Sequence, residues 1–156
     1  MKHTLLFLLM ICACTLQATA TGKQPRLTDD ELMTLVQKQT FRYFWDFAHP
    51  ESGLARERSN DRLEIATIGG SGFGVMAIIV GVERGFITRE QGAERLLKIV
   101  EFLNKADSYH GIWAHWMDGA TGKTIPFSRK DDGADLVESA FMFELSLIHI
   151  SEPTRH

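Results

Sequence analysis

The sequence predicts an all-α fold in which helices form an inner and an outer layer, as in an α/α barrel. Two observations lead to this prediction. The segment from Val75 to Val82 is apolar on every side, as a helix buried all round would be. The segment from Thr88 to Lys105 instead has one apolar and one charged face, which is typical of a helix that covers a core and keeps one side in water.

The composition is that of a globular protein. Of 156 residues, 44% are hydrophobic and 24% are charged, which excludes a disordered chain or a collagen-like repeat. The net charge is -3 and there is no polybasic block, so nothing indicates a nucleic-acid partner. No protein partner is indicated either.

Residues 1–20 are predicted to be a signal peptide. A basic start is followed by an uncharged apolar run from Leu5 to Cys14, which is shorter than the roughly 20 residues of a membrane-spanning helix. Ala18-Thr19-Ala20 fits the cleavage pattern of a secreted or periplasmic protein. Alternatively, Ile11-Cys12-Ala13-Cys14 resembles a bacterial lipoprotein box, which would make the protein an outer-membrane lipoprotein anchored by a lipid on Cys14.

Residues 145–156 are predicted to be a non-native tail. The run from Leu145 to Arg155 matches, residue for residue, the translation of a transposase-type sequencing adaptor. Such additions are left out of fold reasoning. We therefore expect residues 21–144 to be the N-terminal part of a longer protein, interrupted inside a helix.

The first mature helix should start after Thr28. Thr28 and Glu31 have the spacing of a capping box, and the apolar pattern continues to about Phe47, where His49-Pro50 ends it. Residues 48–70 then form a predicted loop.

The Gly-rich run of residues 69–74 leads into the apolar segment. That segment could be a buried strand, but Glu83-Arg84-Gly85 resembles a helix end with glycine at C′, which favours a helix. Thr88 and Gln91 form a second capping box. In the helix that follows, the residues predicted to face inward are Ala93, Leu96, Leu97, Val100 and Leu103.

Residues 107–130 should form a loop or hairpin across the open end of the helix ring, and a new helix should begin near Gly133. Asp131, Asp135 and Glu138 then have the spacing of a single helix face. Like charges this close should raise the pKa of at least one carboxyl group, as a general acid requires. The alternative is that these acids only stabilise a helix start.

Two further groups of residues are candidates for ligand binding. Trp113, His115 and Trp116 could offer aromatic faces to sugar rings, or they could pack on the core. Arg56 and Arg58 precede the glycines of residues 69–74, which lack the strand and lysine of a phosphate-binding loop. Those glycines equally suit the tight packing of a buried helix. No second histidine stands at ligand spacing, so no metal site and no cofactor are predicted.

Residues 32–144 resemble the bacterial glucoamylase-like domain, which is related to β-1,2-glucanases. The resemblance rests on residues 40–46, 53–58, 69–74, Ala106-Asp107 and residues 131–140. It implies an (α/α)6 barrel of which this chain is the first third, and candidate catalytic carboxylates at Asp131, Asp135 and Glu138. It also implies sugar binding by Arg56, Arg58, Trp113, His115 and Trp116.

The resemblance further implies an exported glycoside hydrolase that cleaves a glucan, first of all β-1,2-glucan. The alternatives are an α-glucan hydrolase and a non-catalytic carbohydrate-binding lipoprotein. Glycosidases usually need two carboxyl groups, and the second is expected beyond Glu144. The polypeptide by itself is therefore expected to be inactive.

Overall fold

The computed structural model describes residues 26–60 and 62–151, with side chains as far as residue 146. The predicted signal peptide with Cys14 lies outside the described residues, as do residues 152–156 of the predicted non-native tail. The residues up to Met33 and those from Thr34 onward form two compact units. Each is considered by itself.

The first unit contains the start of helix α2 (Asp29–Trp45). The predicted capping box is confirmed. Thr28 Oγ1 accepts a hydrogen bond from the Glu31 amide at 3.3 Å, and the Thr28 amide donates to the Glu31 carboxylate at 2.8 Å. The hydrogen bonds from the Thr28 backbone and then from its side chain lower the pKa of Glu31.

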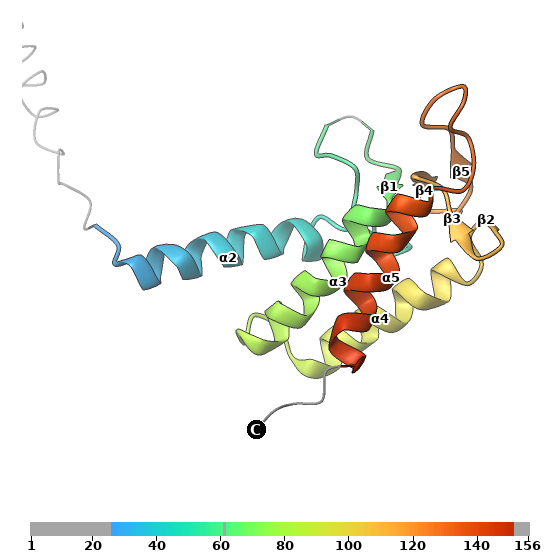
Figure 1. Cartoon of the computed structure of the whole chain (residues 1–156). Coiled ribbons are helices and arrows are strands. Elements are labelled where there is room, and N and C mark those ends of the chain that lie inside the picture. The colour runs from blue at the N-terminus through green and yellow to red at the C-terminus, as the bar shows by residue number, and fades with distance from the viewer. Residues whose placement is uncertain (1–25, 61, 152–156) are drawn as a thin grey trace, which may run out of the picture. The chain divides into compact units, whose positions relative to one another are not determined.

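The second unit is built on three helices, α3 (Ile68–Glu83), α4 (Arg89–Leu103) and α5 (Leu136–Ser151). Figure 1 shows α3 and α5 side by side, and α4 packs against α3. Helix α3 supplies three of the best-buried apolar side chains, those of Ile68, Val75 and Ile78. The helical interpretation of this apolar segment is confirmed.

Helix α3 begins at Ile68, inside the predicted loop of residues 48–70. The glycines of residues 69–74 therefore lie inside the helix. A Cβ atom on Gly72 would lie 2.8 Å from the Phe141 carbonyl oxygen of α5. Only a residue without a side chain allows the two backbones to approach this closely. The tight-packing interpretation of the glycines is therefore confirmed.

Helix α4 begins with the predicted Thr88–Gln91 capping box, and its inward face was predicted correctly for Leu96 and Leu103 but not for Ala93, Leu97 and Val100. The buried residues are Gly92, Ile99 and Leu103, with Leu96 half-buried against the core. Leu97 and Val100 are 58% and 62% exposed, and Ala93 is exposed as well.

Short strands add two small sheets to the helices. Strands β1 (Ile65–Thr67), β4 (Trp116–Asp118) and β5 (Thr124–Ile125) form an antiparallel sheet in the order β1-β4-β5. Strands β2 (Ser108–Tyr109) and β3 (Ile112–Trp113) form a hairpin. The protein is thus helix-rich with small sheets. β1 lies inside the predicted 48–70 loop, and the predicted 107–130 segment is two hairpins.

Within the described ranges, no helix has both the length and the apolar character needed to cross a bilayer.

Candidate active site

The predicted acidic stripe is not a single helix face. Helix α5 begins at Leu136, not near Gly133, so Asp131 lies in the preceding loop and Asp135 lies at the N-cap. Asp135 Oδ1 accepts hydrogen bonds from the amides of Val137 and Glu138 at 2.9 and 3.0 Å. An N-cap carboxylate satisfies amides that the first helical turn leaves free.

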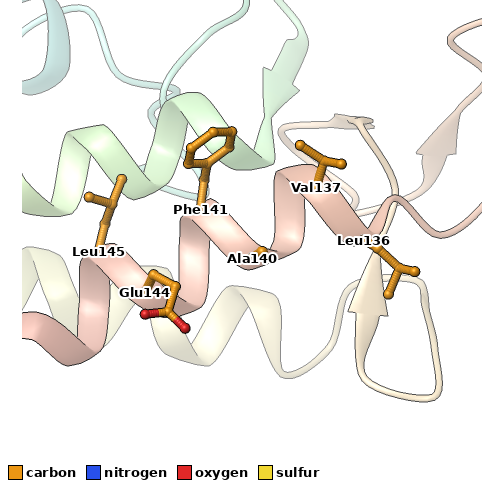
Figure 2. Close-up of a pocket in the computed structure, with 6 residues that line it drawn as sticks. All are labelled: Leu136, Val137, Ala140, Phe141, Glu144 and Leu145. Atoms are coloured by element: carbon orange, nitrogen blue, oxygen red, sulfur yellow. The ribbon is translucent and has the colours of Figure 1, made fainter.

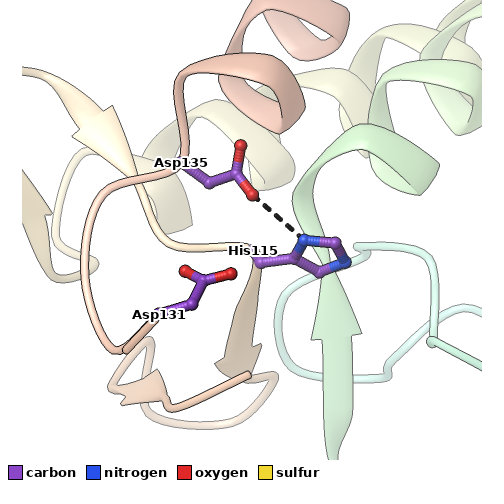
Figure 3. Close-up of side chains that lie close together, drawn as sticks. All are labelled: His115, Asp131 and Asp135. Carbon is purple, nitrogen blue, oxygen red and sulfur yellow. Dashed lines mark hydrogen bonds and ion pairs between the residues drawn. The ribbon is translucent and has the colours of Figure 1, made fainter. Parts of the chain in front are cut away.

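The other oxygen of Asp135 contacts a histidine from a different part of the chain. Asp135 Oδ2 lies 3.0 Å from His115 Nδ1, as Figure 3 shows. The two segments are held together by backbone contacts, since the Asp135 amide donates to the Trp113 carbonyl at 2.8 Å and Ala114 bridges to Ala134.

These contacts decide the protonation of Asp135. Burial acts to raise its pKa, but the hydrogen bonds from the Glu138 amide, the His115 ring and the Val137 amide outweigh it and lower the pKa. Asp135 is therefore not the carboxyl group whose pKa crowding was expected to raise. It is an ionised acceptor and not a proton donor.

The Glu138 carboxylate is hydrogen-bonded to the N-terminus of α3. Its Oε2 accepts a hydrogen bond from the Gly69 amide at 2.9 Å and contacts Thr67 Oγ1 at 3.4 Å. A Cβ atom on Gly69 would lie 2.5 Å from Oε2, so glycine is required for this contact. No described residue bonds Oε1, which leaves that oxygen free for a ligand.

A cleft of about 410 Å³ opens beside Glu138. It collects side chains from α2, the 48–64 loop, β1, α3, the β3–β4 connection and α5. Polar groups and aromatic rings line it together, as in most small-molecule sites. The lining residues are Tyr43, Phe44, Ala55, Arg56, Glu57, Thr67, Gly69, Gly70, Phe73, His115, Glu138 and Phe141.

Of the two predicted arginines, only Arg56 lines the cleft. Its guanidinium lies 4.8 Å from the centre of the Phe47 ring, and its buried Nε has no hydrogen-bond partner among the described residues. Arg58 instead pairs with Glu57 Oε1 at 2.8 Å, and its side chain is 52% exposed.

The predicted tryptophans lie in packing contacts. Trp113 donates its indole N–H to the Leu103 carbonyl at 3.3 Å and packs on Phe143. Trp116 packs on Phe127, with ring centres 4.7 Å apart. Neither indole lines the cleft, so the contacts agree with core packing and not with a sugar platform in this cleft.

Tyr43 and Glu57 line the cleft but were not among the sequence candidates, although both lie in motifs that carry the resemblance. Tyr43 donates its hydroxyl to the Arg56 carbonyl at 2.8 Å. Burial and then the negative charge of Glu57 raise the pKa of Tyr43. Position in a motif was the available signal, but only the fold brings α2 to the cleft.

His115, Asp131 and Asp135 also lie close together, with ligand atoms within 4.8 Å of one another. Such a cluster could in principle hold a cation. His115 Nδ1 and Asp135 Oδ2 already satisfy each other, however, and Asp131 lies beside this hydrogen-bonded pair (Figure 3).

A larger hollow of about 510 Å³ lies outside the cleft, along α5. Figure 2 shows that all the labelled lining residues come from this one helix: Leu136, Val137, Ala140, Phe141, Glu144 and Leu145. Apart from Glu144, it offers no polar group for chemistry.

Comparison with known proteins relates the chain to glucoamylase-like proteins. No family model matches the chain. A crystal structure of a glucoamylase-like protein from Bacteroides uniformis is 74% identical and covers 85% of this chain, with a TM-score of 0.79. The chain is thus a homologue of glucoamylase-like proteins, and the resemblance predicted from the sequence is confirmed.

Two further relatives are named for their substrate. An endo-β-1,2-glucanase from Chitinophaga pinensis, solved with sophorotriose and glucose, is 54% identical over 78% of this chain, with a TM-score of 0.77. An exo-β-1,2-glucooligosaccharide sophorohydrolase from Parabacteroides distasonis is 54% identical over 119 residues, or 76% of this chain. The chain is therefore homologous to β-1,2-glucanases. It spans 33% and 31% of the two solved chains and 16% of the sophorohydrolase.

Proposed function

We propose that this chain is part of a glycoside hydrolase that cleaves β-1,2-glucan. The observation that carries the proposal is the Glu138 carboxylate, which is fixed through one oxygen and lies in a cleft lined by rings and polar groups. The β-1,2 linkage of the proposed substrate is taken from two homologues that are named as β-1,2-glucan hydrolases.

In this proposal, Glu138 handles a proton at the scissile glycosidic bond. The Gly69 amide and Thr67 hydroxyl fix Oε2, so Oε1 keeps a defined position in the cleft. Arg56 and His115 offer hydrogen bonds to sugar hydroxyls from neighbouring walls. Asp131 lies near His115 but outside the helix, so Glu138 is the stronger candidate for this role.

A glycosidase of this type needs a second carboxyl group across the bond, about 5–5.5 Å away for retention and about 6.5–9.5 Å away for inversion. We propose that it comes from sequence beyond Glu144. The chain would then be the first third of an (α/α)6 barrel, with residues 21–144 belonging to the barrel and residues 145–156 being non-native.

We also propose that the protein is exported, with residues 1–20 as its signal peptide. Cleavage after Ala20 would place it in the periplasm or outside the cell, and lipidation at Cys14 would anchor it to the outer membrane. Globomycin, an inhibitor of lipoprotein signal peptidase, separates the two. Accumulation of the precursor would indicate the lipoprotein.

The test uses the full-length protein on β-1,2-glucan, with starch as the α-glucan alternative. Glu138→Gln removes the titrating group and keeps the shape, so turnover should fall about 100-fold or more, which is the usual contribution of a general acid or base. Glu144→Gln, on the same helix but outside the cleft, is the matched control and should retain wild-type turnover.

Turnover of Glu138→Gln within threefold of wild type on every glucan tested would contradict the assignment. Cleavage of starch alone would favour the α-glucan alternative. Binding of a glucan without hydrolysis would favour a carbohydrate-binding lipoprotein.

A further inference from the structure

The hydrogen bonds of Asp135 determine which nitrogen of His115 carries a proton. The pair is mostly buried, with side-chain exposures of 23% for His115 and 17% for Asp135. A carboxylate can only accept, so the proton between Oδ2 and Nδ1 belongs to the imidazole. In the neutral ring the other nitrogen, Nε2, then carries a lone pair and no proton.

Two further contacts hold His115 in place, one to its ring and one to its backbone. Phe127 lies on it with ring centres 4.3 Å apart, and the Ile68 amide at the start of α3 donates to the His115 carbonyl at 3.3 Å. The two nitrogens of an imidazole point in diverging directions in the ring plane, so Nε2 is directed away from Asp135. His115 lines the cleft, and no described residue bonds Nε2.

We propose that Asp135 is a positioning residue that holds His115 in the Nδ1–H form, and that His115 Nε2 accepts a hydrogen bond from a hydroxyl group of the bound sugar. The inference rests on the proposed function for its ligand. Asp135 already accepts three hydrogen bonds, from two amides and the imidazole, so we assign it an indirect role that acts through His115.

Two substitutions at His115 separate the two sides of the ring. His115→Asn places an amide nitrogen near the position of Nδ1, which retains the donor to Asp135 but removes the acceptor in the cleft. His115→Gln places its amide near the position of Nε2, which restores an acceptor in the cleft but removes the hydrogen bond to Asp135. Sophorotriose binding to the full-length protein, measured by calorimetry, should weaken about tenfold in His115→Asn and recover in part in His115→Gln.

Asp135→Asn tests the positioning role. Asparagine is as good an N-cap as aspartate, so the melting temperature should change little. Its amide group can donate to Nδ1, however, which would move the ring proton to Nε2 and turn the cleft acceptor into a donor. Binding should weaken as in His115→Asn, and the double variant should bind no more weakly than either single variant.

Nitrogen-15 NMR of histidine-labelled protein at about pH 8, above the ordinary histidine pKa of about 6.5, reports the tautomer directly. We expect Nδ1–H in the wild type and Nε2–H in Asp135→Asn. Wild-type binding in His115→Asn, additive losses in the double variant, or an Nε2–H wild type would each overturn the inference. Absence of any glucan binding or hydrolysis by the wild type would instead overturn the proposed function, and with it the sugar ligand, while the NMR experiment still decides the tautomer.

Discussion

Gly69 is the residue whose lack of a side chain matters most to the cleft. Its amide bonds Glu138, and a Cβ atom there would lie 2.5 Å from Oε2 and 2.9 Å from Cδ. Both distances are far below van der Waals contact. The Glu138 carboxylate and the α3 backbone can therefore meet only while position 69 is glycine.

We expect Gly69→Ala to displace the Glu138 carboxylate and to lower turnover of the full-length enzyme by at least tenfold. Gly133→Ala is the matched control, because a Cβ atom at Gly133 meets nothing within 4 Å. The measurement is turnover on β-1,2-glucan together with the melting temperature. Equal turnover in both variants would mean that Glu138 does not need its hydrogen bond to the Gly69 amide for its role.

At the start of α5, a single side chain, that of Asp135, stabilises the helix as its N-cap. Asp135 caps the helix through Oδ1 and has a lowered pKa, because its hydrogen bonds to the Glu138 amide, His115 and the Val137 amide together exceed the effect of burial. A group whose pKa is depressed in the folded state stabilises the fold above its unfolded pKa of about 3.9. That stabilisation is lost as the pH falls through the folded value.

Asp135→Ala should therefore destabilise the full-length protein by about 0.5–2 kcal/mol at neutral pH, which is the usual contribution of an N-cap. The difference from wild type should begin to shrink as the pH falls below about 4 and should be lost once the pH passes through the lower folded pKa, where the wild-type carboxylate is protonated. Urea unfolding at a series of pH values measures it. A difference independent of pH would show that the carboxylate charge contributes nothing to the cap.

The helices differ in how far the sequence could define them. The capping boxes at Thr28 and Thr88 were predictable because both partners lie within one turn. The inward face of α4 was not, because apolar residues occur on two adjacent stripes of that helix. Only the packing partner decides which stripe is buried.

The candidate site, like the helices, was predictable only where its residues are close in sequence. The acids were visible as a spaced group, but that spacing assumed a helix that reaches back to Asp131. The contact between His115 and Asp135 joins residues 20 positions apart. The hydrogen bond between the Gly69 amide and Glu138 joins residues 69 positions apart. Neither leaves a local pattern, so only the fold could assign different roles to the three acids.

At the scale of the molecule, the second unit leaves large apolar side chains in water. Leu97 and Val100 on α4 are 58% and 62% exposed, and Leu136 and Val137 on α5 are 72% and 65% exposed. The hollow along α5 in Figure 2 is part of this surface. Contiguous apolar patches on a soluble protein favour association.

We therefore expect residues 21–156, made alone, to self-associate or to lack a cooperative thermal transition. Light scattering after size exclusion and calorimetry measure the two properties. The pair Leu97→Lys and Val100→Glu should reduce association without touching the cleft. A monomer with a sharp cooperative melt would contradict the prediction.

Two adjacent amides at the start of α3 hold two walls of the cleft, since Ile68 donates to the His115 carbonyl and Gly69 to the Glu138 carboxylate. The spacing between these walls is thus set by one peptide unit and not by the residues that join them in sequence. The exposed residues 128–130, which lie outside β5 and beyond the ring contact of Phe127 with His115, can then gain or lose neighbours in sequence while that spacing stays the same. Loop grafts at these residues offer a route to altered oligosaccharide length preference on an unchanged catalytic frame.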